Sequence, residues 1–99
     1  MKLGLLARIE AKPEHAEEIA AMLAEATQVA EQEAFSVTWY AYRLDATTFG
    51  VFDTFADEEG RTAHLNGQIA AALAEAAKKN LIAPADIRPV DLLGVKVQA

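Results

Sequence analysis

The sequence predicts an α+β fold in which four strands form one antiparallel sheet and two helices cover one face of it. Segments with strand-like alternation of apolar residues occur at both ends of the chain and as a pair in the middle. Two longer segments with apolar residues at helical spacing separate them. The resulting order, β-α-β-β-α-β, is the ferredoxin-like or split βαβ arrangement. At 99 residues, 53% hydrophobic and 24% charged, the chain fits one globular domain over residues 1–99.

The first strand and the first helix occupy residues 3–33. Leu3, Leu5, Ala7 and Ile9 alternate with their neighbours at the period of a strand. Pro13 suits the first turn of a helix, and three glutamates follow it where the helix dipole favours negative charge. The predicted helix, residues 13–33, has an apolar stripe formed by Ile19, Met22, Leu23, Ala26, Val29 and Ala30.

Residues 35–44 and 48–55 are rich in aromatic and β-branched side chains and predict an antiparallel hairpin. The polar stretch 45–47 between them predicts its loop. A three-residue loop pairs Tyr42 with Gly50, Tyr40 with Phe52 and Trp39 with Asp53, whereas a four-residue loop would reassign these pairs.

The second helix is predicted over residues 57–79, with Asp57 as its N-cap. Its apolar stripe is Leu65, Ile69, Ala72, Leu73 and Ala76. Pro84 and Pro89 mark residues 80–89 as an irregular connection, which is a candidate lid over a cavity. Residues 90–97 then form the last strand.

Both faces of the predicted sheet carry apolar residues. Leu6 lies opposite Leu3, Leu5 and Ile9, and Leu92 lies opposite Leu93, Val95 and Val97. The helices cover only one face, so something apolar must cover the other. The simplest cover is a second copy of the same sheet, because two-fold homodimers are the commonest oligomers. We therefore expect a homodimer in the form of an α+β barrel.

Composition excludes several classes of function. The formal net charge is -6 and no lysine or arginine cluster occurs, which argues against nucleic-acid and anionic-membrane partners. The absence of cysteine excludes disulfides and thiolate chemistry. No apolar run approaches the roughly 20 residues of a membrane span. We expect a cytoplasmic protein whose partner is a small molecule or another protein.

Residues 50–65 and 89–93, in this order of elements, resemble the antibiotic biosynthesis monooxygenase domain family. The resemblance covers nearly the whole chain. It implies a homodimeric α+β barrel with a cavity between the helices and the sheet of each subunit. It also implies a cofactor-independent monooxygenase that oxidises a small phenol or quinol with O2 to a quinone, because characterised members of the family do so. Other members degrade haem.

His64 is the first candidate for catalysis, because imidazole titrates near neutral pH and a phenol reacts with oxygen more readily once it is deprotonated. The family resemblance supports it, since a histidine recurs at the matching place on the second helix. On a continuous helix, however, His64 lies about 120° from the apolar stripe. A half-exposed residue beside the core is therefore the alternative.

The hairpin aromatics are candidates for substrate binding. Trp39, Tyr40, Tyr42 and Phe52 could form a platform for an aromatic ligand, although aromatics in a hairpin are also typical core or dimer contacts. Arg61 lies on the same side of the helix as His64. It could bind a substrate anion or form an ion pair with Asp57 or Glu58.

No metal or organic cofactor is expected. The acidic runs near residues 14–18 and 57–59 are explained by helix starts, and no phosphate-binding loop is present. The haem-degrading relatives carry an asparagine on the first strand and a tryptophan before the helix histidine, which this chain lacks. Two classes of function remain: the phenol or quinol monooxygenase, and a non-catalytic small-molecule-binding or dimerisation module of the same fold.

Overall fold

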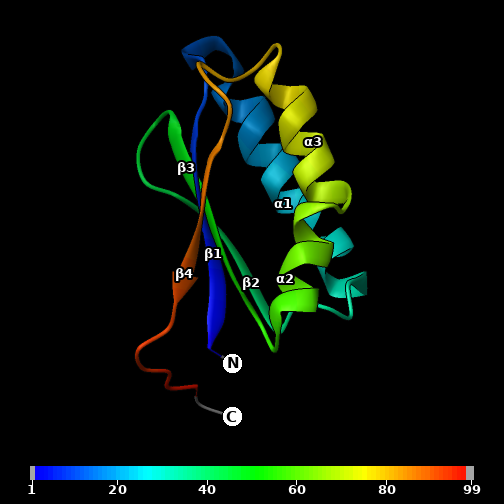
Figure 1. Ribbon diagram of the computed structural model, residues 1–99. Coiled ribbons are helices and arrows are strands. Elements are labelled where there is room, and N and C mark those ends of the chain that lie inside the picture. The colour runs from blue at the N-terminus through cyan, green and yellow to red at the C-terminus, as the bar shows by residue number, and fades with distance from the viewer. Residues whose placement is uncertain (1, 98–99) are drawn as a thin grey trace.

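The computed structural model describes residues 2–97 and contains one four-stranded sheet with helices on one face (Figure 1). The strands are β1 (Leu3–Glu10), β2 (Thr38–Arg43), β3 (Thr48–Phe55) and β4 (Asp86–Asp91). They lie in the order β2-β3-β1-β4, and every neighbouring pair is antiparallel. The helices are α1 (Ala16–Gln32), α2 (Glu58–Leu65) and α3 (Gln68–Ala77). The predicted α+β, ferredoxin-like class is confirmed.

The core lies between the helices and the sheet. Its largest fully buried apolar side chains come from β1, α1, β3 and the segment after α3: Ile9, Ile19, Phe49, Phe55 and Leu81. The inward positions of β1 and β3 alternate strictly with outward ones, as the sequence predicted.

The second helix was predicted as one continuous element, and this was wrong. The chain forms α2, then Asn66 and Gly67, then α3. The Asn66 side chain donates to the carbonyl of Thr62 and its backbone N–H closes the last turn of α2, while Gly67 serves as the N-cap of α3. This break resets the helical phase, so Leu65, placed in the core stripe from the sequence, is 43% exposed.

The outer limits of the other elements also differ from the prediction. A short 3₁₀ turn, η1 (Pro13–His15), precedes α1, and β2 begins at Thr38. The last strand is β4 and not residues 90–97. Pro89 lies inside it because β4 is an edge strand, where a missing N–H costs no ladder bond. Residues 92–97 continue past the sheet, and Leu93 is fully exposed.

The hairpin register agrees with the prediction in all three pairs: Tyr42 with Gly50, Tyr40 with Phe52, and Trp39 with Asp53. The first two pairs lie on the outer face of the sheet. Trp39 and Asp53 lie on the face covered by helices. The ring of Tyr42 packs directly over Gly50, where any side chain would collide with it. The space that glycine leaves is therefore filled by the tyrosine itself.

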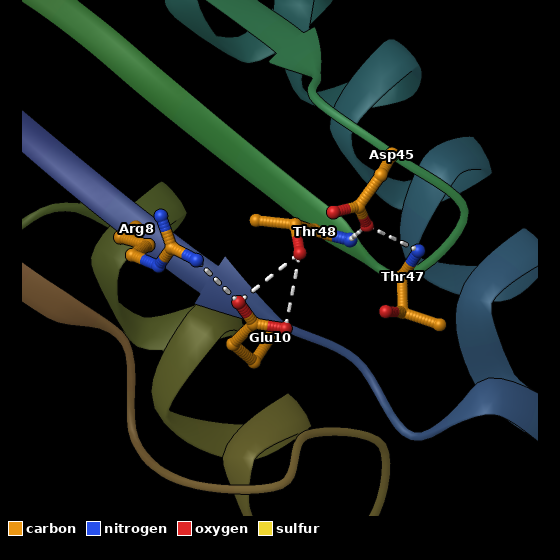
Figure 2. Close-up of polar contacts among 5 residues, drawn as sticks. All are labelled: Arg8, Glu10, Asp45, Thr47 and Thr48. Atoms are coloured by element: carbon orange, nitrogen blue, oxygen red, sulfur yellow. Dashed lines mark hydrogen bonds and ion pairs between the residues drawn. The ribbon is translucent and has the colours of Figure 1, made fainter.

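A polar cluster at the hairpin end of the sheet fixes this register (Figure 2). Asp45 accepts hydrogen bonds from the backbone N–H groups of Thr47 and Thr48, at 3.0 and 2.9 Å. The Thr48 hydroxyl lies 3.1 Å from both carboxylate oxygens of Glu10, which also accepts from Arg8 at 2.9 Å. The aspartate closes the turn and the glutamate ties the hairpin to β1.

Among residues 2–97, none of the helices combines the length and hydropathy that crossing a membrane requires.

Candidate functional site

α2 holds His64 against the sheet. The Oδ1 atom of Asp57 caps the helix by accepting from the Gly60 N–H at 2.8 Å, as the sequence predicted. A Cβ atom at Gly60 would lie 2.6 Å from the carbonyl oxygen of Phe35, so glycine allows the helix to approach the segment that follows α1. One turn later His64 points inward and is 6% exposed. It is buried, and the alternative of a half-exposed flanking residue does not hold.

The imidazole of His64 lies between two carboxylates. Its Nδ1 atom is 3.0 Å from Oε2 of Glu33, at the end of α1, and its Nε2 atom is 2.7 Å from Oδ2 of Asp53 on β3. The rings of Phe35 and Phe55 pack beside it, with centroids 6.2 and 5.4 Å away. All three ionisable side chains are less than one-tenth exposed.

The two carboxylates make different contacts with the ring. The Glu33 contact has the geometry of a hydrogen bond. The Asp53 contact is short but not aligned with the ring N–H, so Oδ2 of Asp53 is buried without a directed hydrogen-bond donor. A carboxylate oxygen can accept from more than one donor, so Oδ2 can take a hydrogen bond from a bound molecule in addition to its ion contact with His64.

The cluster favours the charged form of His64. Burial lowers the pKa of the imidazole, but the close polar contact and negative charge of Asp53, and then those of Glu33, outweigh burial, so its pKa is raised above the ordinary 6.5. Each ring nitrogen also lies next to a carboxylate oxygen. Because an ionised carboxylate can only accept a hydrogen bond, each of the two nitrogens must carry a proton. The imidazolium, with a proton on both nitrogens, donates the hydrogen bond to Glu33 and forms the ion contact with Asp53.

A cavity of about 20 Å³ lies between α2, α3 and the sheet, and Asp53 and His64 both border it. This volume holds about one water molecule. The remaining walls are apolar and come from both helices and from three strands: Leu5, Ala7, Val51, Leu65, Ile69 and Ile87. The arrangement is a small apolar chamber with one acid–base pair at its edge.

The other side chains predicted for the site do not border this cavity. Arg61 donates to both carboxylate oxygens of Glu58, at 2.8 and 2.7 Å, and its other nitrogen lies 3.5 Å from the carbonyl oxygen of Gly4. The ion-pair alternative for Arg61 is therefore the one that the structure shows.

The hairpin aromatics are divided between the faces of the sheet. Trp39, Tyr40 and Tyr42 border a separate hollow of about 430 Å³ along the open edge of β2 beside α1. Phe52 lies on the outer face next to Tyr40. These four residues and His64 are therefore not brought together within one chain.

Sequence reasoning missed Asp53 and Glu33 as partners of His64. Asp53 carried a signal, because it is a charged residue at an inward position of a strand whose other inward residues are Phe49, Val51 and Phe55. Glu33 carried none, since a glutamate at the end of a surface helix is unremarkable until the tertiary structure places it.

The cluster does not have the form of a metal site. Among residues 2–97 no group of three or more His, Asp or Glu side chains is arranged to hold a metal ion. Glu33 and Asp53 contact opposite nitrogens of the ring, so their oxygens do not converge on one point.

The fold is that of the antibiotic biosynthesis monooxygenases. A candidate antibiotic biosynthesis monooxygenase from Nitrosomonas europaea matches with a TM-score of 0.80 and 11% identity, over 93% of this chain and 99% of that one. A second, from Caulobacter crescentus, matches with a TM-score of 0.77 and 17% identity, over 94% and 91%. At these identities the likeness concerns the fold, and at that level the resemblance noted from the sequence is confirmed.

The chain belongs to the same family as the NE2512 protein of Nitrosomonas europaea, a protein of unknown function. The two are 49% identical over 99% of this chain and 95% of that one, with a TM-score of 0.94. No protein-family model matches the sequence, and no curated protein does so.

Proposed function

We propose that the protein is a cofactor-independent monooxygenase that oxidises a small phenol or quinol with O2 to a quinone in the cavity under α2 and α3. The observation that carries this proposal is the Asp53–His64 pair: a buried carboxylate oxygen without a directed donor, beside a buried histidine, at the edge of an apolar cavity. The fold shared with proteins named for monooxygenase activity supports it.

In the proposed reaction Asp53 accepts the proton of the substrate hydroxyl at Oδ2. The adjacent His64 imidazolium stabilises the phenolate through its charge, an effect that is strong where water is excluded. His64 therefore remains part of the proposed site, as expected from the sequence. The proton acceptor in this proposal is Asp53 and not His64, because both nitrogens of the ring already face carboxylates.

The subsequent reaction of the phenolate with O2 needs no added reductant, because the substrate supplies all the electrons. The phenolate gives two electrons to O2 and forms a carbon–oxygen bond at a ring carbon that carries hydrogen, ortho or para to its own oxygen, and His64 protonates the resulting peroxide. Removal of the C–H proton from that carbon, with cleavage of the O–O bond and departure of hydroxide from the outer peroxide oxygen, forms the second carbonyl and one water molecule. The proton held by Asp53 returns to Nε2 of His64. One phenol and one O2 give one quinone and one water.

A substrate must widen the cavity to enter it. Leu65 and Ile87 border the cavity and are also 43% and 37% exposed, so they separate it from solvent. In the proposal these two side chains move aside for an aromatic ring. Its face then packs on the apolar walls while its hydroxyl meets Asp53.

Oxygen uptake with a panel of hydroquinones and naphthols tests the proposed activity. We expect at least one compound to be oxidised at one O2 per quinone formed, with a chelator present and no flavin or metal added. The measurement combines an oxygen electrode with the absorbance of the quinone. If the protein accelerates uptake with none of the compounds, the monooxygenase proposal is refuted.

The small volume of the cavity favours a second candidate, a non-catalytic small-molecule-binding or dimerisation module. A chamber of about 20 Å³ is nearly filled by its own side chains. In this case His64, Asp53 and Glu33 specify the packing of α1, α2 and β3 on one another. A panel compound that binds without oxygen uptake would favour this module.

We also propose that two copies of the chain pack through the outer faces of their sheets. The helices cover only the other face (Figure 1), and the outer face carries the apolar side chains of Leu6, Tyr40, Phe52 and Val90. Tyr40 is 56% exposed and Leu6 is 40% exposed. Arg8, Glu10, Asp86 and Arg88 place both signs of charge at one end of this face, which suits contact with a second copy of itself.

Sedimentation velocity tests this association. We expect a dimer at micromolar concentration and a monomer for Phe52→Arg, which places a charge in the middle of the outer face. Ala74→Glu, on the exposed surface of α3, should remain a dimer. A wild-type monomer under these conditions would refute the pairing of sheets.

A further inference from the structure

We infer that Glu33 is a positioning residue, which holds the Nδ1 proton of His64 and so fixes the orientation and charge of the ring that faces Asp53 and the cavity. This inference deepens the proposed function and rests on it for its use in the reaction. The contacts themselves can be tested without any substrate.

The two carboxylates differ in how they contact the ring and in whether they border the cavity, which indicates different roles. Glu33 meets Nδ1 at 3.0 Å in an aligned hydrogen bond, and it does not border the cavity. Asp53 meets Nε2 at 2.7 Å without alignment and does border the cavity. An aligned bond on one nitrogen fixes the plane of the ring, which leaves the other nitrogen directed toward the reactive side. Glu33 therefore orients the ring and Asp53 meets the substrate.

The surroundings of Glu33 support this role. Its side chain borders two surface hollows, one beside Ser36 and Thr38 and one beside Gly67 and Gln68. The side chain of Glu33 is 9% exposed and that of Asp53 is 2% exposed, so Glu33 lies nearer the surface of the molecule. The negative charge that Glu33 places beside the ring is therefore somewhat less desolvated than that of Asp53.

The charged groups that face His64 come from two elements packed against α2. Glu33 faces it from the end of α1 and Asp53 faces it from β3, while Phe35 and Phe55 supply apolar contacts. On α2 itself, Arg61 is engaged with Glu58. Both carboxylates favour the imidazolium, so removing Glu33 takes away one of two attractions and leaves the other.

The chain offers a direct measurement, because it contains only two histidines. Each ring gives its own NMR signals, and His15 contacts Glu18 at 2.9 Å in a matched pair on the surface. We expect Glu33→Gln to lower the pH at which His64 titrates by about one unit, a tenfold weaker proton affinity, because one nearby opposite charge is lost. The Nδ1–H signal of His64 should also lose its hydrogen-bonded shift.

Glu18→Gln serves as the matched control and should leave the titration of His64 unchanged. Glu33→Asp keeps the charge but shortens the side chain, so its titration should lie between those of wild type and Glu33→Gln. If Glu33→Gln does not fold, Glu33→Asp carries the test alone. A His64 titration that is unchanged or moved to higher pH in the folded variant overturns the inference, whatever the outcome of the oxygen-uptake assay.

Discussion

Replacing His64 with alanine is expected to lower the rate of oxygen uptake by about 10²- to 10⁴-fold, the usual contribution of a positioned acid–base group. In the proposed reaction, the variant lacks both the charge that stabilises the phenolate and the proton donated to the peroxide. The measurement is the initial rate with the best compound of the panel at saturating oxygen. In the wild type, the rate should fall as pH rises through the His64 pKa, which is raised above 6.5.

His15→Ala is the matched control for this experiment. His15 lies on η1, its imidazole contacts Glu18 at the surface, and it has no part in the cavity. Its removal should leave the rate unchanged. His64→Gln, which retains a polar side chain of similar length, guards against a variant that loses activity by unfolding. Equal rates for wild type and a folded His64 variant would remove the histidine from the mechanism.

The second large effect is expected on stability. Asp53→Asn should lower the free energy of unfolding at pH 6 by about 3–5 kcal/mol, because it leaves a buried imidazolium without one of its two counter-charges. Urea unfolding followed by circular dichroism, at fixed protein concentration, measures it. Asp86→Asn breaks an exposed pair with Arg88 and should have little effect. A loss no larger than that of Asp86→Asn would contradict this account of the cluster.

The pH dependence of this loss has a definite sign. The folded-state pKa of His64 is raised, so the folded protein binds more protons than the unfolded chain between 6.5 and that pKa. The stabilisation from the cluster is fully present below pH 6.5, as long as the carboxylates stay ionised, and it is lost as pH rises through the folded pKa. The difference between wild type and Asp53→Asn should therefore be larger at pH 6 than at pH 9.

Much of the fold follows from the sequence because the strands are strongly alternating. The inward series Leu5, Ala7 and Ile9 specified β1, and the observed hairpin register is that of the three-residue loop, one of the two loop lengths that the sequence left open. The limits of the elements were less predictable. The break at residues 66–67 depends on local hydrogen bonds, and β4 depends on an edge position that makes room for Pro89.

The candidate site was predictable only in part. His64 was found by its chemistry and by the family resemblance, but helical geometry placed it beside the core because that geometry assumed one continuous helix. The buried partners Asp53 and Glu33 come from elements separated from α2 in sequence, and only tertiary packing brings them to the two nitrogens of the ring. The aromatic residues of the hairpin were predicted to form the site. The hairpin residue that contacts His64 is instead Asp53, the charged residue that lies among them in the sequence.

The break between α2 and α3 separates the helix that holds the charged cluster from the helix that supplies most of the helical cavity wall. α2 is fixed in place by the Asp57 cap, the close contact at Gly60 and the ion contacts of His64. α3 contributes Ile69, Ala70 and Leu73 to the cavity wall and takes no part in the charged cluster. Substitutions on α3 would therefore reshape the chamber without removing any member of the charged cluster. The volume of the chamber and the charge beside it can thus change independently of each other.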